Sequence, residues 1–405
     1  MKVIKFSQRR LEEIYNRSIQ RRRRVESVVS KIIEDVRLSG DRALLRYTRK
    51  FDRVKIHSKQ LQVSENEING SYQDLKPDFL DALKFAIKNV RNFYEKKPLK
   101  SWKTKHPDGM VLGEIITPIE KVGIYIPGGT APLISTVYMT VVPAQIAGVK
   151  EIYLTTPPDK EGYVNPYILA VANLLKVKAV FKVGGAQAIA ALALGTKTIP
   201  RVDKIVGPGN VYVTEAKRQV FGYVDVDSLA GPSEVVIIAN QHTNPKYIVA
   251  DMKAQAEHSM GVSILITPSK SLIRQVKDKD VRGFIIKVKN LEEAAEISNR
   301  IAPEHIQIMV KNPYNVLKNI RNAGAIFIGQ YTPTAVGDYV AGPSHVLPTG
   351  GTARFFSGLS VLDFVKKTHI IGMTKKSLEN IRCVVEKISE AEGMSKHLES
   401  VNARL

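Results

Sequence analysis

From residue 121 onward, short runs rich in β-branched residues alternate with stretches of helical periodicity, and this alternation constrains the fold most strongly. The runs KVGIYI, EIYLTT, AVFKV and KIV are each followed by glycine or proline and then by a helical stretch. Strands that alternate with helices build βαβ units, whose strands lie parallel in one sheet. The pattern therefore predicts an α/β fold.

A second alternating set follows, with SEVVIIAN, SILITP, GFIIKV and AIFIG as its extended runs. The first hundred residues are predicted to be mostly helical, and the chain from Thr374 is predicted to form a helix and a polar tail. We expect one lobe from 1–124 and 234–365, a second lobe at 125–233 that binds a cofactor, and a C-terminal element at 366–405.

The net charge of +21 raises the possibility of a nucleic-acid-binding protein. The sharpest basic cluster, Arg21–Arg24, precedes residues with helical periodicity, which is typical of the solvated start of a helix. No zinc-finger, RNP-type or helix-turn-helix signature is present. We therefore expect no nucleic-acid partner.

Polar residues interrupt the longest apolar stretch, 131–149, and no apolar run follows the basic N-terminus. These features argue against a membrane span and a secretory signal. The single cysteine, Cys383, fits a reducing compartment. We expect a cytoplasmic protein without a membrane partner.

Four glycine-rich segments follow extended runs, at 127–129, 184–185, 207–209 and 231–233. Glycine at such positions lets the backbone approach a ligand, and the next helix N-terminus favours a phosphate. Glycine also ends strands that bind nothing, and G-x-G-x-x-G is absent. The segments indicate a dinucleotide or phosphate cleft of non-standard sequence.

Gln255 and His258 stand three apart at the end of a helical run, so both can reach one metal ion, although His258 also suits a simple helix C-cap. Glu304 and His305 are adjacent at the edge of an apolar strand, where they form either a general base or a surface pair.

The polar segment 337–345 and the tail add further candidates. Asp338 is a candidate oxygen ligand, and His345 is a candidate for holding a polar substrate. Glu392 and His397 lie in the tail, where such residues are usually only exposed.

Eight separated segments, in order, resemble the histidinol dehydrogenases: KVGIYIPGGTAP, VGGAQAIAALA, KIVGPGNVYVTEAKR, AGPSEV, AQAEH, APEH, GDYVAGPSHVLPTGGTARF and AEGMSKH. The resemblance implies two incomplete Rossmann-like lobes of the aldehyde dehydrogenase type, with a helical N-terminal segment and a small C-terminal tail element. It also implies a zinc-dependent enzyme that oxidises L-histidinol via L-histidinal to L-histidine with two NAD+, the final step of histidine biosynthesis.

The resemblance assigns roles to particular residues. It implies a homodimer with a shared active site, because the tail ligand comes from the other subunit in this family. The implied catalytic residues are Glu304 and His305. The implied zinc ligands are Gln255, His258, Asp338 and His397, which also contact substrate together with His305. The other implied substrate contacts are Ser233, His345 and Glu392, and the implied NAD+ contacts are Tyr125, Gln187 and Asn210.

Two alternatives stay open at this point. A relative in the same family would oxidise another small polar alcohol, for instance a sulfonated diol. A basic nucleic-acid-binding protein belongs to a different class, and it would bind DNA in a salt-sensitive way without dehydrogenase activity.

Overall fold

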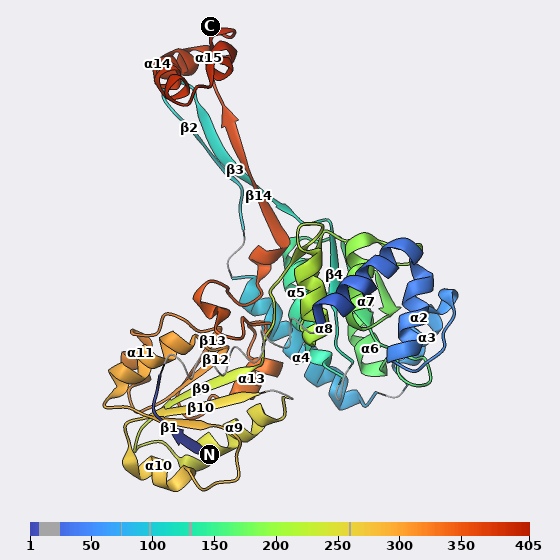
Figure 1. Ribbon diagram of the computed structural model, residues 1–405, viewed down its shortest axis with the longest axis vertical. Helices are drawn as coiled ribbons and strands as arrows, with labels where there is room; N and C mark the ends of the chain where they lie inside the picture. Colours follow the sequence, from blue (N-terminus) through green and yellow to red (C-terminus); the bar gives the residue numbers. More distant parts are fainter. Residues whose placement is uncertain (8–24, 74, 97–98, 129–131, 259–260) are drawn as a thin grey trace. The chain divides into compact units, whose positions relative to one another are not determined.

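The computed structural model describes residues 1–7, 25–73, 75–96, 99–128, 132–258 and 261–405. The chain divides into two compact units, the first formed by Met1–Lys96 with Glu120–Phe364 and the second by Lys97–Ile119 with Val365–Leu405. The first unit contains two parallel sheets with helices around them (Figure 1). The predicted α/β fold is confirmed.

One sheet of the first unit has the strand order β6-β5-β4-β7-β8, and all its pairings are parallel. Helix α5 packs with α6, and α7 packs with α8. The strands are β4 (Lys121–Tyr125), β5 (Glu151–Thr156), β6 (Ala179–Lys182), β7 (Lys204–Val206) and β8 (Asp225–Val226). The helices are α5 (Ile134–Ala147), α6 (Pro166–Leu174), α7 (Gly185–Leu194) and α8 (Val211–Val220).

The N-terminal helices pack on this same lobe. Val29 and Leu44 share an apolar core with Phe181 and Leu192. The sequence-based division grouped these helices with the 234–365 lobe; their apolar faces instead complete the core around β4–β8. The segments concerned are the helical residues 25–39, α2 (Asp41–Phe51) and the short helix η1 (Ser58–Gln60), followed by α3 (Glu65–Gly70), which packs on α6. Helix α4 (Pro77–Tyr94) packs on α5 and also bonds the other lobe, where Asn89 Nδ2 donates to the Val340 carbonyl and Tyr94 Oη donates to the Leu359 carbonyl.

The other sheet has the strand order β1-β11-β10-β9-β12-β13, again entirely parallel. Its strands are β1 (Lys2–Ile4), β9 (Glu234–Ala239), β10 (Val262–Thr267), β11 (Phe284–Lys287), β12 (His305–Met309) and β13 (Ala325–Ile328). Its helices are α9 (Pro245–Ala256), α10 (Lys270–Val276), α11 (Leu291–Ile301), α12 (Pro313–Leu317) and α13 (Thr334–Tyr339), with short helices η2 (Thr352–Arg354) and η3 (Val361–Phe364) later in the chain.

Both faces of this sheet are buried. Val236 and Ile238 point into one apolar cluster, and Val235 and Ile237 point into another. This alternation follows from the two-residue period of a strand, and burial on both faces explains the uninterrupted apolar run in β9.

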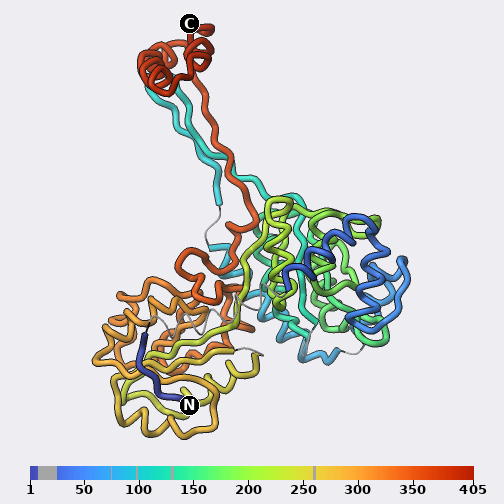
Figure 2. The backbone as a smooth tube through the Cα atoms, in the orientation of Figure 1, coloured from blue at the N-terminus to red at the C-terminus, as the bar shows by residue number. Residues whose placement is uncertain are grey.

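The second unit is an antiparallel sheet with two helices. Strand β3 (Val111–Pro118) lies between β2 (Trp102–Lys105) and β14 (Val365–Gly372), and α14 (Lys375–Ala391) and α15 (Ser395–Asn402) follow. Figure 2 shows two segments far apart in sequence running side by side here. The sequence-based division placed 97–119 in the first lobe, whereas its strands pair with β14.

None of the helices in the described part of the chain combines the length and apolar composition that crossing a membrane requires.

Candidate active site

Neighbouring parallel strands bring Ser233, Glu304 and His305 together. Ser233 immediately precedes β9, Glu304 immediately precedes β12, and the two strands are paired with His305 opposite Val235. The site therefore lies at the amino-terminal edge of this sheet. Ala302, in the left-handed conformation with φ 52°, ends α11 and turns the chain into Glu304.

The Glu304 carboxylate is held by hydrogen bonds. Ser233 Oγ donates to Glu304 Oε2 over 2.5 Å, and the backbone N–H of Glu234 donates to the same oxygen over 3.0 Å. Gln255 Nε2 in turn donates to Ser233 Oγ over 2.9 Å. Glu304 is only 7% exposed and His305 4%, so this is a buried polar cluster and not the surface pair considered as the alternative.

Burial shifts both protonation equilibria towards the neutral forms. It raises the pKa of Glu304 to about 7, although the bonds from Ser233 and Glu234 oppose the rise. It lowers the pKa of His305. His305 Nδ1 lies 3.6 Å from Glu304 Oε2 and has no hydrogen-bond partner among the described residues. An acid poised near neutrality beside an uncharged imidazole is suited to general acid–base chemistry.

The candidate zinc ligands of the first unit lie around this pair. Gln255 is buried on the last turn of α9, and His258 is exposed just beyond the helix end. Asp338 lies on α13, where burial raises its pKa while the charges of His305 and His258 lower it. The charge of His258 also lowers the pKa of Glu304, so these groups share one electrostatic environment.

No group of three or more His, Cys, Asp or Glu side chains within the described ranges forms a metal-binding cluster. Of the zinc ligands expected in the first unit, only His258 and Asp338 belong to these four residue types, because the third, Gln255, is an amide. The remaining candidates, Glu392 and His397, lie at the end of α14 and on α15 of the second unit, and both are exposed.

His345 has a partner that the sequence did not reveal. Its Nε2 lies 3.0 Å from Ser135 Oγ, and burial lowers its pKa to about 4. Nearby, Tyr138 Oη donates to the carbonyl of Tyr339 over 2.7 Å, which ties α5 to α13. Ser135 belongs to the apolar stretch at 131–149, where no local pattern indicated a site residue.

The candidate cofactor residues lie at the carboxyl ends of strands in the β4–β8 sheet. Tyr125 ends β4, and its buried hydroxyl accepts a hydrogen bond from the Gly185 N–H over 3.1 Å. Gln187 lies in the first turn of α7, and its Oε1 has no partner among the described residues. Asn210 caps α8 by accepting from Tyr212 N over 3.0 Å. Such an edge is where open α/β sheets bind ligands.

The glycines expected at these strand ends have a second explanation in packing. A Cβ on Gly128 would lie 2.3 Å from Pro157, and one on Gly184 would lie 2.6 Å from the same proline. These two glycines therefore allow a neighbouring loop to approach, whether or not a ligand binds there.

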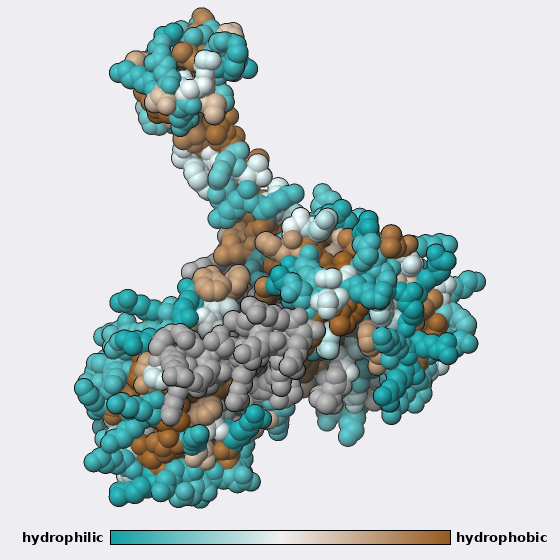
Figure 3. Space-filling model, in the orientation of Figure 1, coloured by the Kyte–Doolittle hydropathy of each residue, from teal (hydrophilic) through white to brown (hydrophobic). Residues whose placement is uncertain are grey.

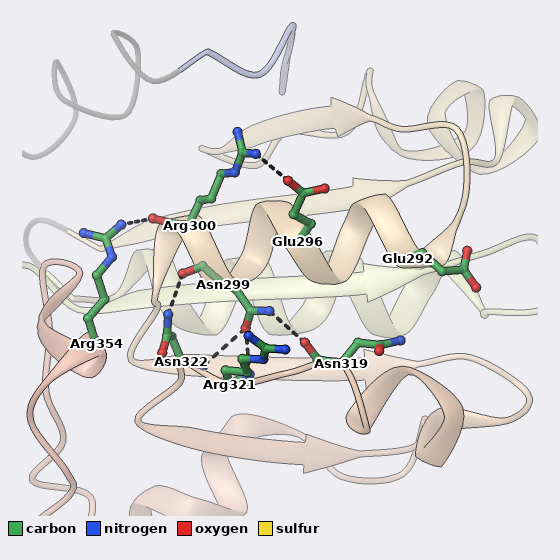
Figure 4. Close-up of a pocket in the computed structure, with 8 residues that line it drawn as sticks. All are labelled: Glu292, Glu296, Asn299, Arg300, Asn319, Arg321, Asn322 and Arg354. Atoms are coloured by element: carbon green, nitrogen blue, oxygen red, sulfur yellow. Dashed lines mark hydrogen bonds and ion pairs between the residues drawn. The ribbon is translucent and has the colours of Figure 1, made fainter.

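A separate polar cleft of about 610 Å³ lies beside α11, and none of the expected site residues lines it (Figure 4). Its side chains bond mainly to one another and to nearby backbone: Asn299 Nδ2 donates to the Asn319 carbonyl, and Arg300 pairs with Glu296. These bonds give the cleft a structural explanation.

Comparison with known proteins concerns the chain as a whole. The family model described as histidinol dehydrogenase matches residues 15–405. Histidinol dehydrogenase from Geobacter sulfurreducens is 48% identical and covers 95% of this chain and 94% of its own length. Histidinol dehydrogenase from Clostridium acetobutylicum is 46% identical, with coverage of 97% and 96%.

Solved structures agree with these relatives. The crystal structure of histidinol dehydrogenase from Elizabethkingia anophelis superposes with a TM-score of 0.89 at 37% identity, over 94% of this chain and 92% of that one. An acetylating aldehyde dehydrogenase from Geobacillus thermoglucosidasius shares the fold alone, with a TM-score of 0.51 at 14% identity over 89% and 98%. The expected likeness to the aldehyde dehydrogenase fold is confirmed. The chain thus belongs to the histidinol dehydrogenase family and is an oxidoreductase.

Proposed function

We propose that this enzyme oxidises L-histidinol via L-histidinal to L-histidine with two NAD+ and a zinc ion, as the final step of histidine biosynthesis. The buried pair of Glu304 and His305 beside Ser233, in a member of this family, is the observation that carries the proposal. Oxidising an alcohol and then a hydrated aldehyde releases protons at both stages, and the pair supplies two bases of different kinds.

The side chains around the pair fit a zinc ion. Asp338 forms no hydrogen bond or ion pair with other described residues, although burial raises its pKa. Gln255 uses its amide nitrogen to bond Ser233, so its oxygen is the atom available to a metal. We infer that Gln255, His258, Asp338 and His397 of the partner subunit hold the ion. Bound zinc would supply Lewis-acid polarisation and a fixed attachment point for the substrate's nitrogen and oxygen donors.

Tyr125, Gln187 and Asn210 are the proposed NAD+ contacts, and NAD+ supplies the hydride acceptor. Gln187 Oε1 has no hydrogen-bond partner among the described residues, which supports this assignment, because a buried amide oxygen without a partner is costly unless a ligand satisfies it.

His305 is the proposed base of the first oxidation. Because burial lowers its pKa, the imidazole is neutral near pH 7 and can take the hydroxyl proton of histidinol as hydride leaves the carbon.

Glu304 is the proposed base of the second oxidation. It takes a proton from the water that adds to the aldehyde carbon, and the hydrate then loses its hydride to yield the acid. A pKa of about 7 lets it accept and release that proton near neutral pH. The bond from Ser233 fixes the orientation of the carboxylate.

The remaining contacts suit a cationic substrate. Burial lowers the pKa of His345 to about 4, so at neutral pH it does not repel the substrate's amine. Glu392 of the partner subunit would supply a negative charge opposite that amine. This combination favours histidinol over an anionic alcohol such as a sulfonated diol.

A homodimer with shared sites is supported by the surface of the second unit. Its sheet and helices expose large apolar side chains, among them Ile371 at 74%, Val384 at 56% and Ile388 at 55%, and brown patches mark its surface in Figure 3. Exposed apolar patches next to polar surface are typical of an interface. The cytoplasmic location stays a prediction.

The test is NADH formation with L-histidinol, with a sulfonated diol and with other small alcohols, in the presence and absence of a chelator. We expect turnover of histidinol that the chelator abolishes and added zinc restores. Turnover of another alcohol with none of histidinol would reject the proposal in favour of a different substrate. Salt-sensitive DNA binding without any turnover would reject enzymatic histidinol oxidation altogether.

A further inference from the structure

A buried ion pair lies beneath the proposed cofactor edge of the β4–β8 sheet. Lys217 Nζ, on α8, is 2.6 Å from Asp227 Oδ1, just beyond β8. The two side chains are only 3% and 4% exposed. Such a pair adds little net stability over apolar residues of similar volume, so its position calls for a reason other than stability.

Lys217 and Asp227 both form hydrogen bonds with the backbone of Gly207. Lys217 Nζ donates to the Gly207 carbonyl over 2.5 Å, and the Gly207 N–H donates to Asp227 Oδ2 over 2.8 Å. The carbonyl of Gly207 is therefore held by a buried positive charge, and its N–H by a buried negative charge.

A third contact closes the remaining side of Gly207. Its φ is +117°, and a Cβ there would lie 2.2 Å from the carbonyl oxygen of Tyr125. The turn thus presses against the end of β4 while the ion pair holds it from α8 and β8. Together these contacts hold the turn in one conformation.

The clamped turn leads directly to Asn210. That residue begins α8 by accepting hydrogen bonds from Tyr212 N and Val213 N, and Lys217 lies further along the same helix. The ion pair therefore fixes both the turn and the helix between which Asn210 is placed.

We propose that Lys217 and Asp227 are positioning residues for NAD+, which hold the turn from Gly207 to Asn210 in the conformation that meets the cofactor. The inference rests on the proposed cofactor role of Asn210. Neither side chain touches the nucleotide; both act through the backbone of Gly207.

The neutral double variant Lys217→Met/Asp227→Asn tests this directly. It removes both charges together, so no lone charge stays buried, and the oxygen of the introduced amide would still accept from the Gly207 N–H. We expect the Kd for NAD+, measured by calorimetry, to rise about 10-fold to 100-fold, as for the loss of one or two buried hydrogen bonds. The KM for NAD+ should rise with it, while kcat at saturating NAD+, the Kd for histidinol and bound zinc change less than about twofold.

Lys204 and Asp225 offer a control pair, in which Lys204 is buried and Asp225 is half-exposed. They form another ion pair of the same sheet, 2.7 Å apart, at the amino ends of β7 and β8 and without a bond to the turn. Lys204→Met/Asp225→Asn should leave the Kd for NAD+ within about twofold. If the first double variant does not fold, Lys217→Gln/Asp227→Asn replaces it, since two amides can bond each other without reaching the Gly207 carbonyl.

Asn210→Ala separates two kinds of failure. If Asn210→Ala weakens NAD+ binding and the double variant does not, the positioning role is overturned while the proposed function stands. If neither change weakens NAD+ binding, the cofactor assignment is overturned and the positioning role with it. An equal loss of NAD+ affinity in the Lys204 control would also overturn the inference, because the effect would then be general to the lobe.

Discussion

At the scale of single residues, burial sets the chemistry of the site. Glu304 has a pKa of about 7 because it is removed from water, and the hydrogen bonds from Ser233 and Glu234 limit that rise. Burial also lowers the pKa of the neighbouring His305 imidazole. One buried environment therefore gives two bases that both work near neutral pH.

This predicts a pH dependence for the second oxidation. Below its pKa Glu304 is protonated and cannot accept a proton, so kcat/KM for L-histidinal should fall as the pH drops below about 7. Ser233→Ala removes a bond that stabilises the carboxylate, so the midpoint of this limb should move up by about 0.5 to 1 pH unit. Ser135→Ala, which touches His345 instead, should leave the midpoint in place. A Ser233→Ala midpoint equal to that of the wild type would contradict the assignment of Glu304.

Metal binding is predicted to depend on His258 and Asp338. Replacing either with alanine should weaken zinc binding by about tenfold or more, because each removes a direct ligand. The control is His242→Ala, an exposed histidine of the same lobe that is outside the proposed set. Elemental analysis after dialysis provides the measurement, and full zinc retention in both site variants would rule out these ligands.

The identity of the site residues was predictable from the sequence only in part, and their burial was not. The types and spacing of Glu304, His305, Gln255 and His258 indicated a site, because such groups are adjacent or on one helix face. Their burial was not predictable, since it arises from neighbouring strands far apart in the chain. Ser135 was missed for the same reason, because it lies 210 positions from His345.

At the scale of elements, close backbone contacts constrain the turn after β7 at the cofactor edge. Gly207→Ala would place a Cβ 2.2 Å from the Tyr125 carbonyl oxygen and force a side chain into a positive φ. We expect a loss of about 3 kcal/mol or more in the free energy of unfolding. Gly222 also has a positive φ, but nothing lies within 4 Å of a Cβ at that position. We therefore expect Gly222→Ala to lower the free energy of unfolding by only about 1 kcal/mol. Urea denaturation compares the two, and equal losses would refute the steric argument.

The elements themselves were predictable where their signal is local. The alternation of strands and helices follows from apolar runs bounded by glycine or proline, and the structure confirms it. Strand β1 has only three residues and forms through its pairing with β11, which lies far along the chain. Strands β3 and β14 likewise depend on each other across about 250 positions, so their common sheet had no local signature.

At the scale of the whole molecule, the proposed site requires two subunits. An inactive His258→Ala chain mixed with an inactive His397→Ala chain should regain activity, because one of the two sites of a mixed dimer would contain both histidines. About a quarter of wild-type activity is expected from random exchange, in which about half of the dimers are mixed. The control is a mixture of His258→Ala and Asp338→Ala chains. Each site takes both of these residues from one chain, so every site of a mixed dimer lacks one of them and no activity returns. Verified heterodimers without activity would refute a shared site.

The most direct measurement of the central claim is the number of NADH molecules formed for each molecule of L-histidinol consumed, with zinc present and histidine quantified as product. We expect two NADH and one histidine per histidinol, and no turnover after the metal is removed. One NADH with accumulation of histidinal, or full turnover without metal, would contradict it.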